Sequence, residues 1–231
     1  MAPALQISTD LRGGEMHALS RAAILSHYRR YRDIRTDIQT TVLENIPHSR
    51  FLECARRIGL SDGKLLFTNN QVELTLAFDL ALYTANPGRT RAIDRCARKR
   101  LETSGPDETL VLKGLQASRF SIFRVIRRCD PAGVLLEDLM RGGVISLLDE
   151  GLEQSARFDD VFAMRIAPIE EFVMTCGAIV PISFEIFEEM TKFFSEGTSA
   201  ELAALADHRR FAAALYELAI ELGLMDLVTY R

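Results

Sequence analysis

Apolar residues recur at helical spacing through roughly the first half of the chain. The first stripe runs through residues 16–46, with apolar side chains three or four positions apart, as one face of an α-helix requires. Its members are Ile24, Tyr28, Tyr31, Ile34, Ile38, Val42 and Ile46. Arg35 falls within the stripe, so this face is not wholly apolar. The pattern predicts one long helix or two helices in line.

Proline, glycine and capping residues divide the next segment into shorter helices. Pro47 suits a helix start, Gly59 suits a left-handed helix end, and Pro106 fits a first turn. Asn70 resembles a capping residue before a helix that is apolar on most sides and is therefore expected in the core. We expect helices over residues 48–58, 70–84, 89–102 and 106–117.

From Arg119 the pattern changes to short apolar runs separated by turn residues. The expected strands cover residues 119–126, 134–140, 144–148, 161–166 and 172–175. Asp149-Glu150-Gly151 and Phe158-Asp159-Asp160 are among the expected turns. Short strands joined by tight turns predict an antiparallel meander. Five such strands form either an open sheet or a small barrel of SH3-like or OB-like type.

Two helices are expected after the sheet. Ser183 can cap the first, which ends at Gly197, and Thr198 with Glu201 forms a capping box for the second. The second helix runs to Leu222, with a break near Asp207-His208. Phe193, Phe194 and Tyr216 belong either to the core or to an interface, so the oligomeric state stays open.

These patterns predict an α+β protein with an N-terminal helical half, a central five-stranded antiparallel sheet or small SH3/OB-like barrel, and a C-terminal helical pair. The expected units are a flexible tail over residues 1–15, helices over 16–118, strands over 119–182 and helices over 183–231. We expect the last unit to pack back on residues 16–118.

Composition places the chain among ordinary globular proteins. It has 231 residues, of which 48% are hydrophobic and 26% charged. The four cysteines form no C-x-x-C pair, and the N-terminus lacks the pattern of an export signal, so reduced thiols and a cytoplasmic location are expected. No apolar stretch approaches the roughly 20 residues that cross a bilayer, so we expect no membrane partner.

Charge is divided unevenly along the chain. Residues 1–129 carry 21 Lys and Arg against 13 Asp and Glu, a net of +8, while residues 130–231 carry 7 against 19, a net of −12. A basic half of this kind can indicate an anionic partner, either nucleic acid or an acidic protein surface. The alternative is that the two halves pack together and neutralise each other.

Three groups of cations are the candidate contacts for such a partner. Arg91, Arg95, Arg98 and Lys99 fall within an arc of about 100° on one helix. Arg29, Arg30 and Arg32 interleave with two tyrosines, a pattern that can bind single-stranded nucleic acid but also suits core tyrosines with solvated neighbours. Arg127 and Arg128 end the first expected strand.

Other chemistry has less support. The acidic doublets Glu137-Asp138, Asp149-Glu150, Asp159-Asp160 and Glu170-Glu171 fall at different ends of a meander, so no metal site and no cofactor is expected. No histidine pair or phosphate-binding glycine loop occurs, and Cys176 is expected to be buried rather than reactive. The favoured hypothesis is a non-enzymatic binding or regulatory module. The alternative is an enzyme with an unrecognised site between the helical half and the sheet.

Overall fold

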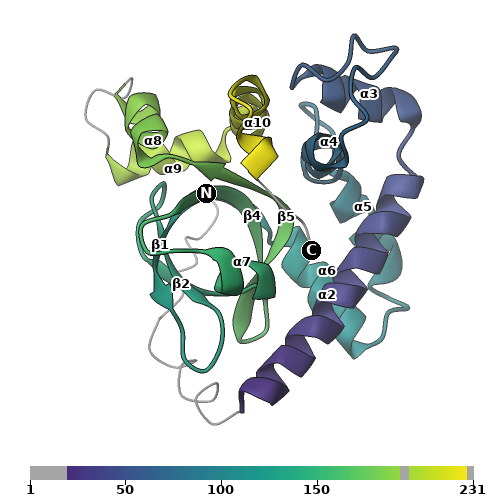
Figure 1. Ribbon diagram of the computed structural model, residues 1–231. Helices are drawn as coiled ribbons and strands as arrows, with labels where there is room; N and C mark the ends of the chain where they lie inside the picture. The colour runs from purple at the N-terminus through teal and green to yellow at the C-terminus, as the bar shows by residue number, and fades with distance from the viewer. Residues whose placement is uncertain (1–19, 193–197, 228–231) are drawn as a thin grey trace.

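The computed structural model describes residues 20–192 and 198–227, and it has the expected α+β architecture. The N-terminal helices are α2 (Arg21–Glu44), α3 (His48–Arg56), α4 (Gln71–Tyr83), α5 (Ala92–Arg100) and α6 (Pro106–Gln116). They lie on one side of a closed five-stranded sheet, and the C-terminal helices lie along another edge of it (Figure 1). The expected tail over residues 1–15 lies outside the described residues.

The N-terminal helices follow the sequence pattern closely. Ser20 caps α2, accepting a hydrogen bond from the Ala23 amide at 3.3 Å. The apolar stripe of α2 is buried at Ile24, Tyr28, Tyr31, Ile38 and Val42. After α3, Gly59 has a φ of +76°, and the Leu60 amide donates back to the Ala55 carbonyl at 3.0 Å. This is the predicted left-handed helix end.

The strands are β1 (Arg119–Arg128), β2 (Val134–Asp138), β3 (Val144–Leu148), β4 (Val161–Ile169) and β5 (Phe172–Ile182). Each strand pairs with two others in the order β1-β2-β3-β5-β4, and β4 pairs back with β1, so the sheet closes on itself. The prediction of an all-antiparallel meander was wrong. β3 pairs with β5 in parallel, with Leu147 opposite Val173, so the sheet is mixed.

A short helix, α7 (Glu150–Ser155), explains this difference. The predicted turn at Asp149-Glu150-Gly151 is instead the start of α7, where the Asp149 carboxylate accepts from the Leu152 amide at 3.0 Å. Because α7 carries the chain across the opening of the closed sheet, β4 starts away from β3 and pairs with β1 (Figure 1). Leu152 packs against the apolar interior of the sheet.

The C-terminal helices are α8 (Phe184–Thr191), α9 (Ser199–Asp207) and α10 (Phe211–Glu221), followed by the 3-10 turn η1 (Leu224–Leu227). Thr198 and Glu201 form the predicted capping box, and the predicted break falls between α9 and α10. Helix α10 contacts both α4 and β5. Tyr216 is fully buried in the core, whereas Phe193 and Phe194 lie outside the described residues.

A buried polar group joins these layers. Asp79 of α4 and Arg165 of β4 form an ion pair inside the protein, with Nε–Oδ1 and Nη2–Oδ2 distances of 3.0 and 3.1 Å. The Tyr216 hydroxyl donates to the same carboxylate at 2.9 Å. The Arg165 guanidinium also lies 4.6 Å from the centre of the Tyr83 ring. One salt-bridged cluster therefore connects α4, β4 and α10.

Within the described residues, none of the helices has the length and apolarity needed to cross a membrane.

Candidate functional site

The arginines of α2 are engaged within the protein. Arg29 makes a bidentate contact with Glu150 of α7, at 2.6 and 3.1 Å. Arg30 forms an ion pair with Asp107, and Arg32 lies 3.5 Å from the Glu150 carboxylate. The neighbouring tyrosines are buried. These arginines hold α2 against the rest of the fold, so they offer little free charge to a partner.

Helix α5 keeps more of its positive charge free. Arg91 is held by Asp94 at 2.7 Å and by the Gln116 carbonyl. Arg95 donates to the Thr90 carbonyl but remains exposed. Arg98 and Lys99 are exposed and form no ion pair with a described carboxylate. The predicted stripe is thus reduced to three free cations.

A second group of free cations lies at the end of β1. Arg127 and Arg128 are exposed and donate only to backbone carbonyls, those of Arg128 and Gln154. The connection from α7 to β4 runs beside them. Its ends are fixed by the Arg128–Gln154 bond and by bonds that join Val125 to the backbone of Asp159 and Asp160 at 2.9 and 2.8 Å.

Between those fixed ends, the connection presents a cation and an aromatic ring to solvent. Phe158 is 76% exposed, more than any other large apolar side chain among the described residues. Arg157 is exposed and forms no ion pair with a described residue. Asp159 follows with a φ of +72°, a left-handed conformation that turns the chain back into β4. We call Arg127, Arg128, Arg157 and Phe158 the edge patch.

The sequence pattern assigned Phe158 to a turn and did not single out Arg157. The signal available in the sequence was an aromatic residue among polar turn residues. Neither the helical pattern nor the strand pattern requires an aromatic side chain at that position. The place of Phe158 beside Arg127 depends on β4 pairing with β1 rather than with β3. This is a long-range relationship that the local pattern does not contain.

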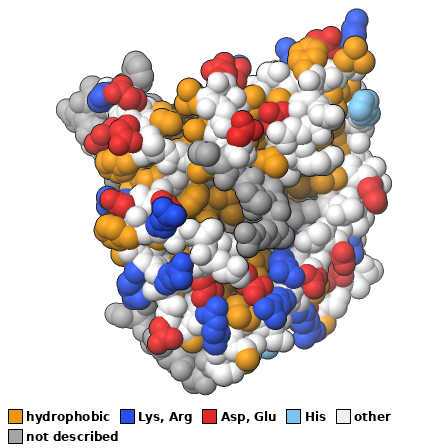
Figure 2. All heavy atoms as spheres, in the orientation of Figure 1, with side chains coloured by type: hydrophobic (Ala, Val, Ile, Leu, Met, Phe, Trp, Pro, Cys, Tyr) orange, Lys and Arg blue, Asp and Glu red, His pale blue; other side chains and the backbone are white. Residues whose placement is uncertain are grey.

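The candidate cations do not form one continuous face. α5 lies among the N-terminal helices, whereas β1 lies on the opposite side of the closed sheet (Figure 1). On the face seen in Figure 2, Lys and Arg side chains alternate with Asp and Glu rather than gathering alone. Ion pairs also join the two halves of the chain, as in Arg21–Glu153, Arg29–Glu150, Arg119–Asp138 and Arg124–Glu137.

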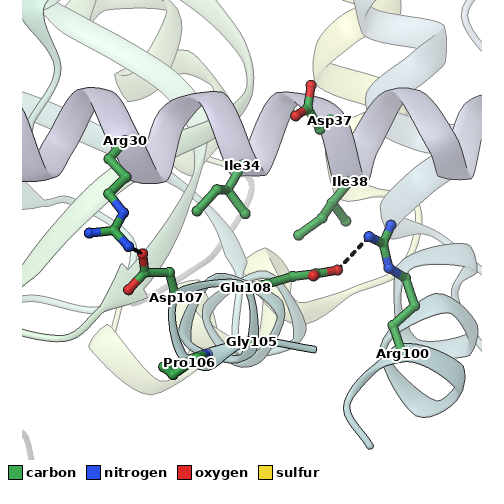
Figure 3. A pocket seen from close by; sticks show the side chains of 9 residues that line it. All are labelled: Arg30, Ile34, Asp37, Ile38, Arg100, Gly105, Pro106, Asp107 and Glu108. Carbon is green, nitrogen blue, oxygen red and sulfur yellow. Dashed lines mark ion pairs between the residues drawn. The ribbon is translucent and has the colours of Figure 1, made fainter. Parts of the chain in front are cut away.

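A hollow lies elsewhere, among α2, the end of α5 and the start of α6 (Figure 3). It measures about 390 Å³. Arg30 and Arg100 reach into it from opposite sides and pair with Asp107 and Glu108, the second pair at 2.5 Å. Neither His nor Cys lines it. Its first-turn carboxylates are already neutralised, and the Asp37 carboxylate, which also lines it, points away from them (Figure 3). The hollow lies apart from the helix–sheet boundary where an enzyme site was expected.

The cysteines and the acidic doublets also have structural surroundings. Burial raises the pKa of the Cys176 thiol to about 11, against the opposing attraction of Arg165. That thiol is therefore a poor nucleophile. Asp138 is buried and accepts from Ser121, while Glu137 pairs with Arg124. Within residues 20–192 and 198–227, no three His, Cys, Asp or Glu side chains converge as a metal site would require.

Comparison with known proteins gives one match. Residues 23–225 match the model of a family described as a family of unknown function (DUF7986). No curated protein and no solved structure matches the chain.

Proposed function

The chain belongs to this family of unknown function, DUF7986, and from that premise we propose that it is a non-enzymatic module that binds single-stranded nucleic acid at the edge patch. The observation that carries the proposal is the exposure of Phe158 beside three arginines that lack carboxylate partners among the described residues. Proteins that bind single strands combine a cationic surface for the backbone with aromatic rings on which bases stack.

The geometry of the patch suits a flexible strand more than a duplex. Arg127 and Arg128 lie at the end of one strand, and Arg157 and Phe158 lie on the adjoining connection, so three cations and one exposed ring share a short stretch of the surface. A base can stack on that ring only when it is unpaired or turned out of a helix. The expected ligand is therefore single-stranded DNA or RNA.

The strand order adds support by analogy. A closed β1-β2-β3-β5-β4 order, with β3 parallel to β5 and a helix after β3, resembles the OB-fold, whose members include oligonucleotide binders. In this chain α2 contacts the loops on both sides of the sheet, through Arg21 to the Pro131 carbonyl and Tyr31 to Glu170. Among the described residues, α2 forms no hydrogen bond or ion pair with a side chain of the edge patch.

The test is a titration of the purified protein against labelled single-stranded DNA, single-stranded RNA and duplex DNA at several salt concentrations. Single strands should bind best at low salt. If all three arginines contact phosphates, the logarithm of affinity should fall against the logarithm of salt with a slope of about −2. Absence of binding to every oligonucleotide at low salt would refute the proposal and leave an acidic protein surface as the partner to pursue.

A charge-matched pair of variants locates the site. Arg127→Glu with Arg128→Glu should abolish binding, whereas Arg98→Glu with Lys99→Glu changes the net charge equally on α5 and should leave most of it. The opposite result would move the site to α5. Equal losses in both variants would show that binding depends only on net charge.

A further inference from the structure

Two large apolar side chains are exposed together on the connection between α3 and α4. Leu65 is 68% exposed and Phe67 is 65% exposed. Leu66, between them, points the other way and packs against the hydrophobic core. Residues 61–67 form what we call the tip loop.

The tip loop is fixed by its own hydrogen bonds. The Asp62 carboxylate accepts from the amides of Lys64 and Leu65, at 2.7 and 2.8 Å. Ser61 pairs with Leu66 in an isolated β-bridge, and the Phe67 amide donates to the Leu60 carbonyl at 2.9 Å. The loop therefore holds Leu65 and Phe67 outward in a defined conformation, so little conformational freedom remains to be lost when they bind.

Free cations accompany the two apolar side chains. Lys64 and Arg56 are exposed, and neither forms an ion pair with a described residue. Arg56 lies against the loop, since a Cβ placed on Gly63 would be 3.4 Å from its Cδ. The carboxylate of Asp62 is used in holding the turn, and those amide hydrogen bonds lower its pKa.

The loop also projects from the molecule. It extends beyond α3, at the end of the helical half away from the closed sheet (Figure 1). The corner formed there carries apolar side chains together with Lys or Arg and with Asp or Glu (Figure 2). A projecting apolar tip with cations beside it suits a negatively charged surface that has an apolar interior. The tip can enter the interior while the cations stay at the charged boundary.

We propose that the tip loop inserts Leu65 and Phe67 into the interfacial region of an anionic lipid bilayer, with Lys64 and Arg56 facing the lipid head groups. Such a contact is peripheral and needs no membrane-spanning helix. It revises the expectation of no membrane partner, which rested on the lack of a spanning segment alone. Each cation near an anionic surface adds to the attraction, and salt weakens it. The proposal is independent of the edge patch.

The chain has no tryptophan, so Phe67→Trp introduces a single fluorescent reporter into the full protein. On addition of phosphatidylcholine vesicles rich in phosphatidylserine, its emission should shift to the blue and acrylamide should quench it less. Vesicles of phosphatidylcholine alone should give a smaller shift. The control is Leu222→Trp, which places the same reporter at an apolar position that is 52% exposed and lies outside both the tip loop and the edge patch; its emission should not shift.

Co-sedimentation with the same vesicles gives a second measurement. Leu65→Ser with Phe67→Ser should reduce binding at least tenfold, and Lys64→Glu with Arg56→Glu should remove the preference for anionic lipid.

An unchanged Phe67→Trp emission at low salt would overturn the proposal, as would equal shifts in both reporters. A shift that grows with protein concentration without vesicles would overturn it in favour of a second copy. Oligonucleotide binding measured with the Phe67→Trp variant tests the edge patch separately, because this variant leaves the edge patch unchanged.

Discussion

Asp79 and Arg165 form a bidentate ion pair in the interior, and the two side chains come from opposite halves of the chain. The pair reverses the general charge distribution, because its carboxylate comes from the basic half and its guanidinium from the acidic half. Tyr216 and the rings of Tyr83 and Phe120 complete its surroundings. Both charges are thus compensated by protein groups, which is the condition under which a buried pair is tolerated.

The first prediction concerns the removal of one charge from this pair. Asp79→Asn keeps the shape of the side chain but leaves the Arg165 guanidinium buried without a counter-charge. The free energy of unfolding should fall by about 3–5 kcal/mol, measured by urea denaturation. Glu137→Gln, which breaks the more exposed pair with Arg124, is the control and should cost no more than about 1 kcal/mol. Equal effects would mean that Asp79 is less enclosed than its burial indicates.

The sequence pattern could predict most of the local structure around this pair but not the pair itself. The α4 segment was expected to be central because it is apolar on most sides, and Asp79 stood in it as an interruption. Its partner lies 86 positions away on β4. Local periodicity says which face of an element is buried, but not which distant charge will meet it.

The closed sheet shows the same limit. β5 extends to Ile182 rather than ending at residue 175 as expected. The strand starts, the helix caps and the Gly59 ending could be predicted, because each depends on residues within one turn or one strand. The parallel contact of β3 with β5 could not, since it depends on where α7 delivers the chain. The role of the candidate cations in binding stays a prediction. Their freedom to bind depended on distant carboxylates such as Glu150 and Asp107.

A second prediction tests the close packing beside the pair. A Cβ on Gly177 would lie 2.2 Å from the Asp79 Oδ1 and 3.1 Å from the Arg165 Cβ. Gly177→Ala should therefore displace the carboxylate and lower the free energy of unfolding by about 1–3 kcal/mol. Gly151→Ala, in α7, meets only the end of the Asp149 side chain at 3.3 Å and is the matched control. A thermal midpoint for Gly177→Ala equal to that of the control would contradict this account.

The third prediction follows from thiol burial. Cys54 and Cys176 are buried, whereas Cys96 and Cys129 are partly exposed, and all four are free. In the native protein, Ellman's reagent should modify Cys96 and Cys129 rapidly and the other two only as the fold opens. Urea should make all four react at similar rates. Rapid native modification of Cys176 would indicate a path to solvent that its burial excludes.

The same thiol has a consequence for stability at alkaline pH. Its folded pKa of about 11 lies above the value of about 8.5 for an unperturbed thiol. The folded state therefore holds the proton more tightly, and this stabilisation is complete below about pH 8.5 and is lost as the pH rises toward 11. Cys176→Ala should have a flatter decline of unfolding free energy over that range. An identical decline in both proteins would contradict the prediction.

The fourth prediction concerns the contact of α2 with α7. The hydrogen bonds from Arg29 lower the pKa of Glu150, against the opposing effect of its partial burial. The folded state therefore favours the ionised form, so the stabilisation is present above the unfolded pKa and is lost as the pH falls through the lower, folded one. Glu150→Gln should flatten the acid side of the stability profile between about pH 5 and pH 3.

The matched comparison for this contact is Glu171→Gln, which removes one carboxylate from the turn between β4 and β5. Urea midpoints measured across the acid range should lose less of their pH dependence in that variant. Added salt should weaken the Glu150 effect in the wild type, since the Arg29 side chain is 55% exposed. If Glu150→Gln and the wild type respond identically to acid, the Arg29–Glu150 contact does not contribute to stability in solution.

The last prediction separates stacking from charge at the edge patch. Phe158→Ala removes the exposed ring while leaving Arg127, Arg128 and Arg157 in place. Loss of one stacked base should weaken binding of a single-stranded oligonucleotide by about 1–3 kcal/mol, or roughly 5- to 150-fold. The salt slope should not change, because no phosphate contact is lost.

Arg127→Ala should do the reverse, with a smaller loss of affinity and a slope reduced by about 0.7. Phe158→Trp keeps the stacking surface, so it should bind as well as the wild type and its fluorescence should be quenched on binding. If Phe158→Ala instead binds like the wild type, the exposed ring has no part in recognition and the cations alone would account for any affinity.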